Sequence, residues 1–461
     1  MNMINVRRLT VMTFLGAGML SGISAQVSPL QVDTLKETKI PDQWDLQSCI
    51  DYAKEQNITI RKNRITAVST QIDVKTAKAA MFPSLSFSTG QQVVNRPYQE
   101  TSSRVSGSEI ISSNSKTSYN GNYGLNASWT LYNGNKRLKT IQQEKLNNQM
   151  AELDVATSEN NIQESIAQVY IQILYAAESV KVNENTLQVS IAQRDRGQEL
   201  LNAGSIAKSD LAQLEAQVST DRYQLVTAQA TLEDYKLQLK QLLELDGENE
   251  MNIYLPALSD ENVLAPLPTK RDVYISALSL RPEIEASKLN VEASELGINI
   301  AKSSYFPTIS LSAGIGTNHT SGSDFTFGEQ VKNGWNNSIG LSVSVPIFNN
   351  RQTKSAVQKA KLQYETSMLS LLDEQKALYK TIESLWLDAN SAQQRYAAAN
   401  EKLKSTKISY ELISEQFNLG MKNTVELLTE KNNLLQAQQE QLQAKYMAIL
   451  NTQLLKFYQG D

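Results

Sequence analysis

Residues 77–86 read AKAAMFPSLS and residues 301–310 read AKSSYFPTIS, so the same transition through phenylalanine and proline occurs twice in the chain. The correspondence continues in LYNGNK, residues 131–136, and IFNNRQ, residues 347–352. It returns at Gly204 and Gly420, which lie 216 positions apart (420 − 204). A repeated supersecondary unit buries its apolar faces only against a neighbouring unit. We therefore expect the two halves to form one interleaved body that belongs to a closed ring.

The repeat also defines the expected domain organisation. Repeat 1 covers about residues 40–246 and repeat 2 about residues 270–458, and between them lies a linker, residues 247–269, with one glycine and three prolines. Residues 1–25 have the pattern of a secretory signal peptide, with two arginines, an apolar run from Leu9 to Leu20 and a cleavage site after Ala25. The run is shorter than the roughly 18 apolar residues of a membrane-spanning helix. We expect residues 26–461 to be exported.

Composition excludes several classes of function. The 461 residues carry a net charge of −4, and no basic patch alternates with aromatic residues, so a nucleic-acid partner is not expected. The lone cysteine, Cys49, has no disulfide partner and is predicted to be a small buried helix residue. The lone histidine, His319, lies in a polar segment and is predicted to be solvated rather than a ligand. No phosphate loop, cysteine pair or histidine-containing triad can be assembled, so we expect no enzyme, no metal and no cofactor.

Four segments alternate strictly between apolar and small polar residues, at about residues 84–93, 121–132, 307–317 and 337–346. Each is about as long as a strand that crosses a bilayer at a tilt, and its second face is made of Ser, Asn and Gly, which suits a water-filled lumen. A soluble antiparallel sheet with one solvated face has the same alternation. Aromatic residues near the strand ends favour a membrane barrel, and these are Phe82, Trp129, Tyr132, Phe306 and Phe348. The polar stretches 91–120 and 317–337 are predicted to be surface loops.

The remaining sequence predicts long helices. No proline interrupts residues 136–203, which as one helix would be roughly 100 Å long at 1.5 Å per residue. Apolar residues recur there at alternating spacings of three and four, and again 216 positions later, which is typical of coiled-coil packing. The next helix, from about residue 208, keeps the same spacing and is broken only by Asp221. We expect two antiparallel hairpins that turn at Gly204 and Gly420, and one helix opening each half, residues 45–80 and 272–304.

Several local motifs carry a family resemblance over about residues 40–458. They are WDLQSCIDYA from residue 44, FPSL from residue 82, LRPEI from residue 280, VPIFNNR from residue 345, and the turn sequences around Gly204 and Gly420. The chain resembles the TolC-like outer membrane efflux protein (outer membrane factor) family. The resemblance implies an α+β membrane protein, in which a long α-helical coiled-coil barrel continues a transmembrane β-barrel with four strands per protomer and twelve in a homotrimer. Four strands alone would leave two unpaired edges in lipid, which agrees with a trimer.

The resemblance also implies a function, a location and partners. The chain would be a passive exit duct in the outer membrane of a Gram-negative bacterium, with a large periplasmic portion. It would dock to a periplasmic adaptor (membrane fusion) protein and an inner-membrane pump of the RND, ABC or MFS type. Type I protein secretion is an alternative that the family also serves. A soluble periplasmic coiled-coil adaptor or tether is an alternative of a different class.

In this family the helical hairpin ends form a gate, and the resemblance assigns residues to it. Lys422 falls at a basic tie position, with Ser209 and Asp210 of the other hairpin as its expected partners. Glu426 falls where a ring of carboxylates attracts cations, and Phe417 where an aromatic residue narrows the aperture. A second acidic ring position carries Thr429, with Glu430 one step around the helix. Alternatively, Lys422 and Glu426 form an i, i+4 pair on a solvated helix face.

Overall fold

The structure is a computed structural model that describes residues 41–98, 102–106, 109–113, 116–246, 251–256, 263–321, 323 and 325–460. The predicted signal peptide and its cleavage site lie outside these residues, as do residues 247–250 and 257–262 of the predicted linker. The description below concerns the compact unit that begins at Pro41. Within the described part of the chain, no helix has the length and apolar composition needed to cross a bilayer.

Each half of the chain contributes two strands to one antiparallel sheet with the order β1-β4-β5-β6. The strands are β1 (Ser84–Asn95), β4 (Thr117–Asn133), β5 (Thr308–Thr320) and β6 (Asn336–Ser344). The central pair, β4 and β5, joins the two halves, with Ala127 opposite Ala313. β4 begins four residues before the predicted start. β6 ends two residues before its predicted end, because Pro346 has no N–H group to donate to a neighbouring strand.

The two stretches predicted to be loops contain regular structure, which corrects that expectation. Strands β2 (Ser102–Ser106) and β3 (Glu109–Ser113) pair with each other between β1 and β4. Helix α8 (Phe327–Asn333) lies between β5 and β6 and begins with a capping box, in which Thr326 N donates to Glu329 Oε2 over 2.8 Å. The box satisfies N–H groups that a helix start leaves without intrahelical partners.

His319 is not solvated, contrary to the sequence-based expectation. It lies on β5 and is only 8% exposed. Its ring is stacked on Tyr123 at 5.9 Å between centroids, and Phe327 of α8 contacts it edge-on at 5.1 Å. The opposite residue on β4 is Gly121, where any side chain would collide with the imidazole. The residues next to His319 in the sequence are polar and therefore gave no sign of a buried aromatic contact. That contact forms only when β4, β5 and α8 come together.

Four shorter helices flank the long ones, where the sequence predicted only two. They are α2 (Leu46–Gln56), α3 (Ile58–Ala79), α6 (Lys270–Leu280) and α7 (Pro282–Lys302). The first break occurs at Asn57, whose Oδ1 accepts the N–H of Thr59 at 2.9 Å and caps α3. The second break occurs at Arg281, because Pro282 restricts the preceding residue to extended backbone, and Pro282 then starts α7.

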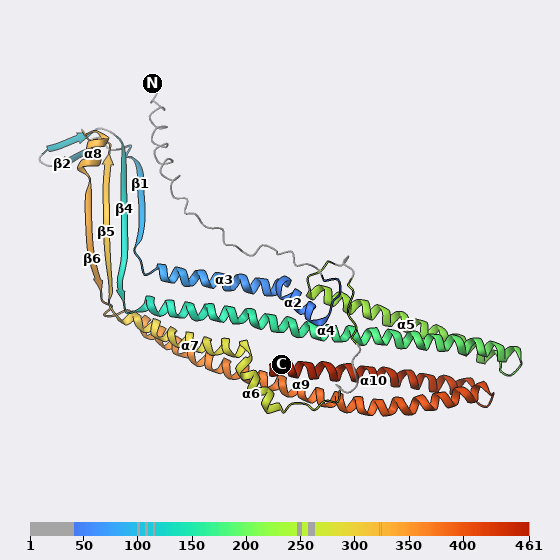
Figure 1. Cartoon of the computed structure of the whole chain (residues 1–461). Helices are drawn as coiled ribbons and strands as arrows, with labels where there is room; N and C mark the ends of the chain where they lie inside the picture. The colour runs from blue at the N-terminus through green and yellow to red at the C-terminus, as the bar shows by residue number, and fades with distance from the viewer. Residues whose placement is uncertain are drawn as a thin grey trace, which may run out of the picture. The chain divides into compact units, whose positions relative to one another are not determined.

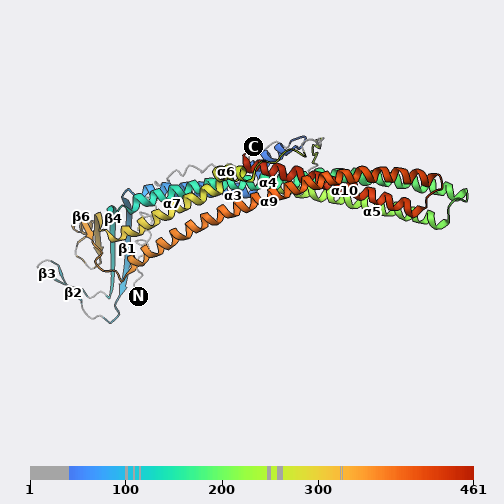
Figure 2. The same ribbon diagram turned by 90° about the horizontal axis from the view of Figure 1, so that it is seen from below.

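The long helices form two hairpins of matching size. They are α4 (Lys136–Asn202) with α5 (Lys208–Leu242), and α9 (Gln352–Asn418) with α10 (Thr424–Gln459), and α4 and α9 have 67 residues each. In the part of the helical layer next to the sheet, the helices pack in the order α3, α4, α7 and α9. In the part farther from the sheet, which ends in the hairpin turns, the order is α5, α4, α10 and α9. Figures 1 and 2 show the sheet at one end of the long helices and the hairpin turns at the other.

The predicted apolar spacing marks the residues that are buried between these helices. Ile166 and Ile173 of α4 are fully buried in a cluster with Trp44 and Cys49, and Ile382 of α9 is buried in the cluster of the second half. Cys49 is buried as predicted, and burial raises the pKa of its thiol to about 12. The linker takes part in this packing, because Ile253 forms a parallel bridge with Trp44.

Candidate functional site at the hairpin ends

The two hairpin turns have the same backbone geometry. Gly204 and Gly420 adopt the left-handed conformation, with φ of +75° and +74°. In each turn the residue after the glycine donates its N–H five residues back, from Ser205 to Leu200 and from Met421 to Gln416. This is the Schellman arrangement, which satisfies the last carbonyl groups of a helix and requires φ above zero at the glycine. The turns predicted at both glycines are therefore present.

Lys422 is bound within its own hairpin. Its Nζ lies 2.6 Å from Glu426 Oε1, one helical turn further along. Glu426 also closes a capping box with Asn423, because Asn423 N donates to Glu426 Oε2 at 3.2 Å and Glu426 N donates to Asn423 Oδ1 at 2.9 Å. The hydrogen bond from Lys422, followed by that from Asn423 N, lowers the pKa of Glu426. Within one chain, the i, i+4 alternative describes Lys422 and Glu426.

The expected partners on the other hairpin are engaged elsewhere or exposed. Asp210 accepts the N–H of Ala207 at 3.0 Å and so caps the start of α5. Ser209 is exposed. The tie expected between Lys422 and these residues is therefore not formed within one chain.

Phe417, which the resemblance assigns to the aperture, lies in the interior of one chain. It is 3% exposed, inside the chain near the end of α9, because an aromatic ring gains from leaving water. Glu430 is also engaged, since Ser409 Oγ of α9 donates to its Oε2 at 3.0 Å. Thr429 is exposed and donates to Val425 O at 2.8 Å. The place of Phe417 at the aperture of an assembled channel stays a prediction, and Glu430 joins α9 to α10 within one chain.

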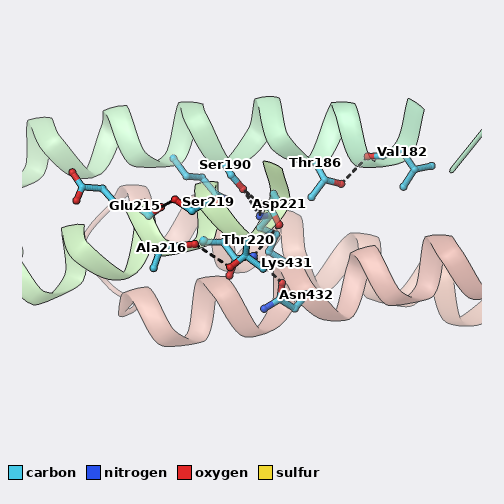
Figure 3. Close-up of polar contacts among 12 residues, drawn as sticks. Val182, Thr186, Ser190, Glu215, Ala216, Ser219, Thr220, Asp221, Lys431 and Asn432 are labelled. Atoms are coloured by element: carbon cyan, nitrogen blue, oxygen red, sulfur yellow. Dashed lines mark hydrogen bonds and ion pairs between the residues drawn. The ribbon is translucent and has the colours of Figure 1, made fainter. Parts of the chain in front are cut away.

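A buried polar cluster joins the two hairpins, and the sequence did not predict it. Lys431 Nζ of α10 forms an ion pair with Asp221 Oδ2 of α5 and donates to Ser190 Oγ of α4. Ser190 Oγ in turn donates to Asp221 Oδ2, and Gln217 Nε2 donates to Asp221 Oδ1 at 2.9 Å. The exposed fractions of Lys431, Asp221 and Ser190 are 3%, 1% and 2%. Figure 3 shows the three side chains converging from three helices.

Burial and charge act against each other at Lys431. Removal from water disfavours the ammonium ion and lowers the pKa of Lys431, while the hydrogen bond and charge of Asp221 oppose that shift. A buried charge is tolerated when it is paired and hydrogen-bonded, and Asp221 and Ser190 together supply both requirements. We name these three residues the Lys431 cluster.

Two further hydrogen bonds join the hairpins beside the Lys431 cluster. Gln193 Nε2 of α4 donates to Tyr410 Oη of α9 at 2.8 Å, and Gln217 Nε2 of α5 donates to Asn432 Oδ1 of α10 at 3.3 Å. The sequence held one signal for this site, which is the charged Asp221 at a position where the heptad pattern requires an apolar residue. Its partners could not be read from the pattern, because Lys431 lies 210 positions further along the chain.

Comparison with known proteins agrees with this architecture. The outer membrane efflux protein family matches residues 49–244 and 273–460. Outer membrane efflux protein BepC of Brucella suis biovar 1 (strain 1330) is 24% identical over 294 residues, which are 63% of this chain and 61% of that protein. Outer membrane protein TolC of Escherichia coli (strain K12) is also 24% identical over 294 residues, covering 62% of this chain and 58% of TolC. The chain thus spans about three fifths of the length of these relatives.

Solved structures show the same fold over most of the chain. A crystal structure of CusC has a TM-score of 0.76 at 18% identity and covers 90% of this chain and 91% of that one. The crystal structure of the outer membrane protein VceC from Vibrio cholerae has a TM-score of 0.73 at 15% identity, over 90% of this chain and 96% of that one. The family match covers most of both repeats. The chain therefore belongs to the outer membrane efflux protein family and is an outer membrane protein.

Proposed function

We propose that this chain is the exit channel of an efflux assembly in the outer membrane. Three copies would join their four-stranded sheets into a twelve-stranded transmembrane barrel and continue it as a helical tunnel. Substrates would pass through it from a periplasmic adaptor and an inner-membrane pump of the RND, ABC or MFS type. The observation that carries this proposal is that the sheet and the helical layer each have two unpaired edges. In both cases one edge is complementary to the other, so that one copy can pair with the next.

The open edges of the sheet are β1 and β6. An unpaired strand edge in lipid leaves backbone N–H and C=O groups without partners, at a cost of several kcal/mol each. Pairing β6 of one copy with β1 of the next removes both edges and closes the sheet.

The edge helices present apolar stripes that packing within one chain leaves exposed. On α3 these residues are spaced by seven, three and four, and α9 and α5 carry comparable ones. They are Ile58, Ile65, Val68 and Ile72 on α3, Leu362, Leu369, Leu372, Tyr379, Ile408 and Leu412 on α9, and Tyr223, Val226 and Leu237 on α5. Such spacing is that of coiled-coil seams, and exposed apolar surface of this extent marks an interface. The stripes fit α3 and α5 of one copy against α9 of the next.

The two faces of the sheet differ in composition. One face has the composition of a lipid-facing surface and the other that of a channel lumen. One face exposes large apolar side chains such as Leu85, Phe87, Ile339 and Leu341. The other carries rows of small polar residues across all four strands, for example Ser84, Ser128, Ser312 and Gly340. None of the residues in these four strands is Asp, Glu, Lys or Arg. A lumen with this lining would pass water and solutes without selecting them by charge.

A charge filter would then be located at the hairpin ends. Three Glu426 side chains, one per copy, would form a carboxylate ring that favours cations. Lys422 lies against each carboxylate and offsets part of its charge, so we expect a modest cation preference. A tie from Lys422 to Ser209 or Asp210 of a neighbouring copy would share the ammonium group of Lys422 with Glu426, since that group has three N–H donors.

The experiment is purification of the full chain in detergent, followed by measurement of its mass and of its conductance in a planar bilayer. We expect a trimer that conducts ions. A monomer that stays soluble without detergent and does not conduct would contradict the proposal and favour the adaptor or tether alternative.

Protein secretion is a second candidate for the cargo. Relatives of the chain are named for different cargoes. Alkaline protease secretion protein AprF of Pseudomonas aeruginosa is named for a protein and is 21% identical over 312 residues. Pyoverdine export outer membrane protein OpmQ of Pseudomonas putida is named for pyoverdine and is 20% identical over 292 residues. The uncharged lumen face sets no electrostatic barrier to an extended polypeptide. The test is removal of this protein from a cell that depends on it. If the protein serves secretion, the cell should stop secreting a reporter protein; if it serves efflux, the cell should lose resistance to small toxic molecules.

A further inference from the structure

We propose that α8 is an interfacial helix, whose aromatic side chains lie at the boundary between the hydrocarbon and the head groups of the membrane. The contact surface consists of Phe325, Phe327 and Trp335, which we name the α8 aromatic surface, and its partner is the lipid layer. The inference rests on the proposed function, in which the apolar face of the sheet meets lipid. This surface anchors the end of the sheet that is farthest from the long helices.

α8 is held against a part of β5 that β6 does not cover. The pairing of β6 with β5 stops at Gly316, while β5 continues to Thr320. Thr317 Oγ1 donates to Val331 O of α8 at 2.7 Å. Thr320 N donates to Gln330 Oε1 at 2.8 Å, so α8 takes the place of a strand at this edge. Figure 1 shows α8 at the end of the sheet that lies away from the long helices.

The contacts of α8 come from the apolar face of the sheet. Side chains alternate between the two faces of a strand, so Thr317 and His319 lie on the same face as Ile315. Phe327 contacts the ring of His319 edge-on, and the hydroxyl group of Thr317 donates to α8. α8 therefore covers the face on which Ile339 is exposed, and not the face with the small polar residues.

Packing within the chain leaves the α8 aromatic surface open. The exposed fractions are 51% for Phe325, 46% for Phe327 and 57% for Trp335. The backbone around these residues is fixed, because Gln330 Nε2 donates to Phe325 O at 2.9 Å and Thr326 closes the capping box of α8. Exposed aromatic side chains at the end of an apolar band are typical of the interfacial girdles of membrane barrels.

The depth of α8 agrees with such a boundary. On β4, Trp129 lies near the long helices and Tyr119 lies beside α8, since its ring is 5.6 Å from that of His319; the two are ten residues apart (129 − 119). Ten residues extend about 34 Å along a strand, which at a tilt of about 40° corresponds to about 26 Å of depth. The apolar band of an outer-membrane barrel is about 25 Å tall. Trp129 and α8 thus lie at opposite boundaries.

The charges of α8 favour the lipid boundary itself over a particular head group. α8 carries one acidic and one basic residue, Glu329 and Lys332, so it has no net charge that would attract a charged head group. Both are exposed and offer polar groups to the head-group layer beside the aromatic rings. A neighbouring copy is the competing occupant, because Val93 near the end of β1 is 62% exposed on the same face.

Spin labelling of the full chain in phosphatidylcholine vesicles tests the proposal. In a Cys49→Ala background, a nitroxide is attached at Phe325→Cys or at Trp335→Cys. Its collision rates are measured with oxygen, which dissolves in lipid, and with a water-soluble nickel chelate. Ile339→Cys, on the apolar face, is the lipid control, and Ser338→Cys, on the opposite face, is the water control.

We expect the ratio of oxygen to chelate collisions at Phe325→Cys and Trp335→Cys to be several-fold higher than at Ser338→Cys and lower than at Ile339→Cys. A ratio equal to that of Ser338→Cys would place the surface in water and overturn the inference. Few collisions with either reagent would place it under a neighbouring copy and also overturn it. A water-like ratio at Ile339→Cys would instead overturn the lipid-facing sheet of the proposed function.

A second measurement leaves the label outside the α8 aromatic surface. The double variant Phe325→Ser with Trp335→Ser removes two of the three rings and keeps Phe327 against His319. We expect a label at Lys332→Cys to collide several-fold more often with the chelate in this variant, because water then fills the space beside α8. Unchanged collision rates would contradict the interfacial anchor. The melting temperature of the double variant in detergent verifies that it has folded.

Discussion

The two hairpins share a backbone and differ in the residues at their ends and between them. Their first helices have equal length, and their turns have the same glycine conformation and the same hydrogen bonds. Yet α10 begins with a side-chain cap at Asn423, while α5 begins at Ala207, which has no such side chain. Lys431 is buried on α10, while the equivalent Glu215 on α5 is exposed. Duplication supplied the scaffold, and the substitutions that followed made one hairpin distinct from the other.

The largest expected effect comes from leaving Lys431 buried and unpaired. Asp221→Leu should lower the free energy of unfolding by about 3–5 kcal/mol, since one partner of a buried ion pair is removed. Adding Lys431→Met should restore most of this loss, because no charge then remains. Denaturant unfolding of the three proteins measures both steps. The equivalent exposed substitution, Glu215→Met, should change stability by less than about 0.5 kcal/mol, and a similar loss there would contradict the comparison.

The next largest loss of stability is expected on substitution of the two turn glycines, and the two losses should be equal. Gly204→Ala and Gly420→Ala each force a Cβ into the left-handed region, at a cost of about 1–2 kcal/mol. Among the described residues, and apart from the glycine and its two chain neighbours, no atom lies within 4 Å of either ideal Cβ position, so backbone strain is the expected cost. Thermal unfolding of the two variants tests this. Losses that differ clearly between them would show that the turns are not equivalent in the assembled protein.

A smaller effect separates the starts of α5 and α10. Asn423→Ala should cost about 1 kcal/mol, because the N–H of Glu426 loses the Oδ1 acceptor of Asn423. Ala207→Asn should stabilise by a similar or smaller amount, since it adds a cap that α5 lacks. Unfolding in denaturant compares both variants with the parent. A loss in Asn423→Ala together with no gain in Ala207→Asn would show that a side-chain cap matters only at the start of α10.

The smallest effect is the pH dependence of the cap at Glu426. Its pKa is lowered in the folded chain from the ordinary value of 4.5, so the stability that it contributes is present above that ordinary pKa and is lost as pH falls through the lower folded value. Cation preference, measured as reversal potential in a salt gradient, should fall over the same acidic range. Glu426→Gln should remove this pH response. A response that survives in Glu426→Gln would place the titrating group elsewhere, and Glu430→Gln serves as the control.

Patterns of short period were the most predictable part of the molecule. Alternation every two residues located the four strands of the main sheet, and the three-and-four spacing located the long helices, because each period reflects local backbone geometry. The helix breaks were less accessible. Asn57 and Pro282 are each local signals of a helix boundary, but the prediction treated residues 45–80 and 272–304 as continuous helices.

The site itself was predicted only in part. The glycine turns and the Lys422–Glu426 pair are local, since their partners lie within one or two helical turns. The burial of Phe417 and of His319 depends on packing between elements that are distant in sequence, which the local pattern did not reveal. The Lys431 cluster combines three helices from both halves, so only Asp221 was visible beforehand, as an interruption.

The sequence alone determined the duplication, the type of each main element and the position of both hairpin turns, because these depend on residue identity and spacing within a single helix or strand. Tertiary structure decided which hairpin contacts which, and which charges are withdrawn from water. Burial is a property of the assembled helices: the same lysine is an ordinary surface residue until α4, α5 and α10 enclose it, and its pairing with Asp221 exists only in that enclosure.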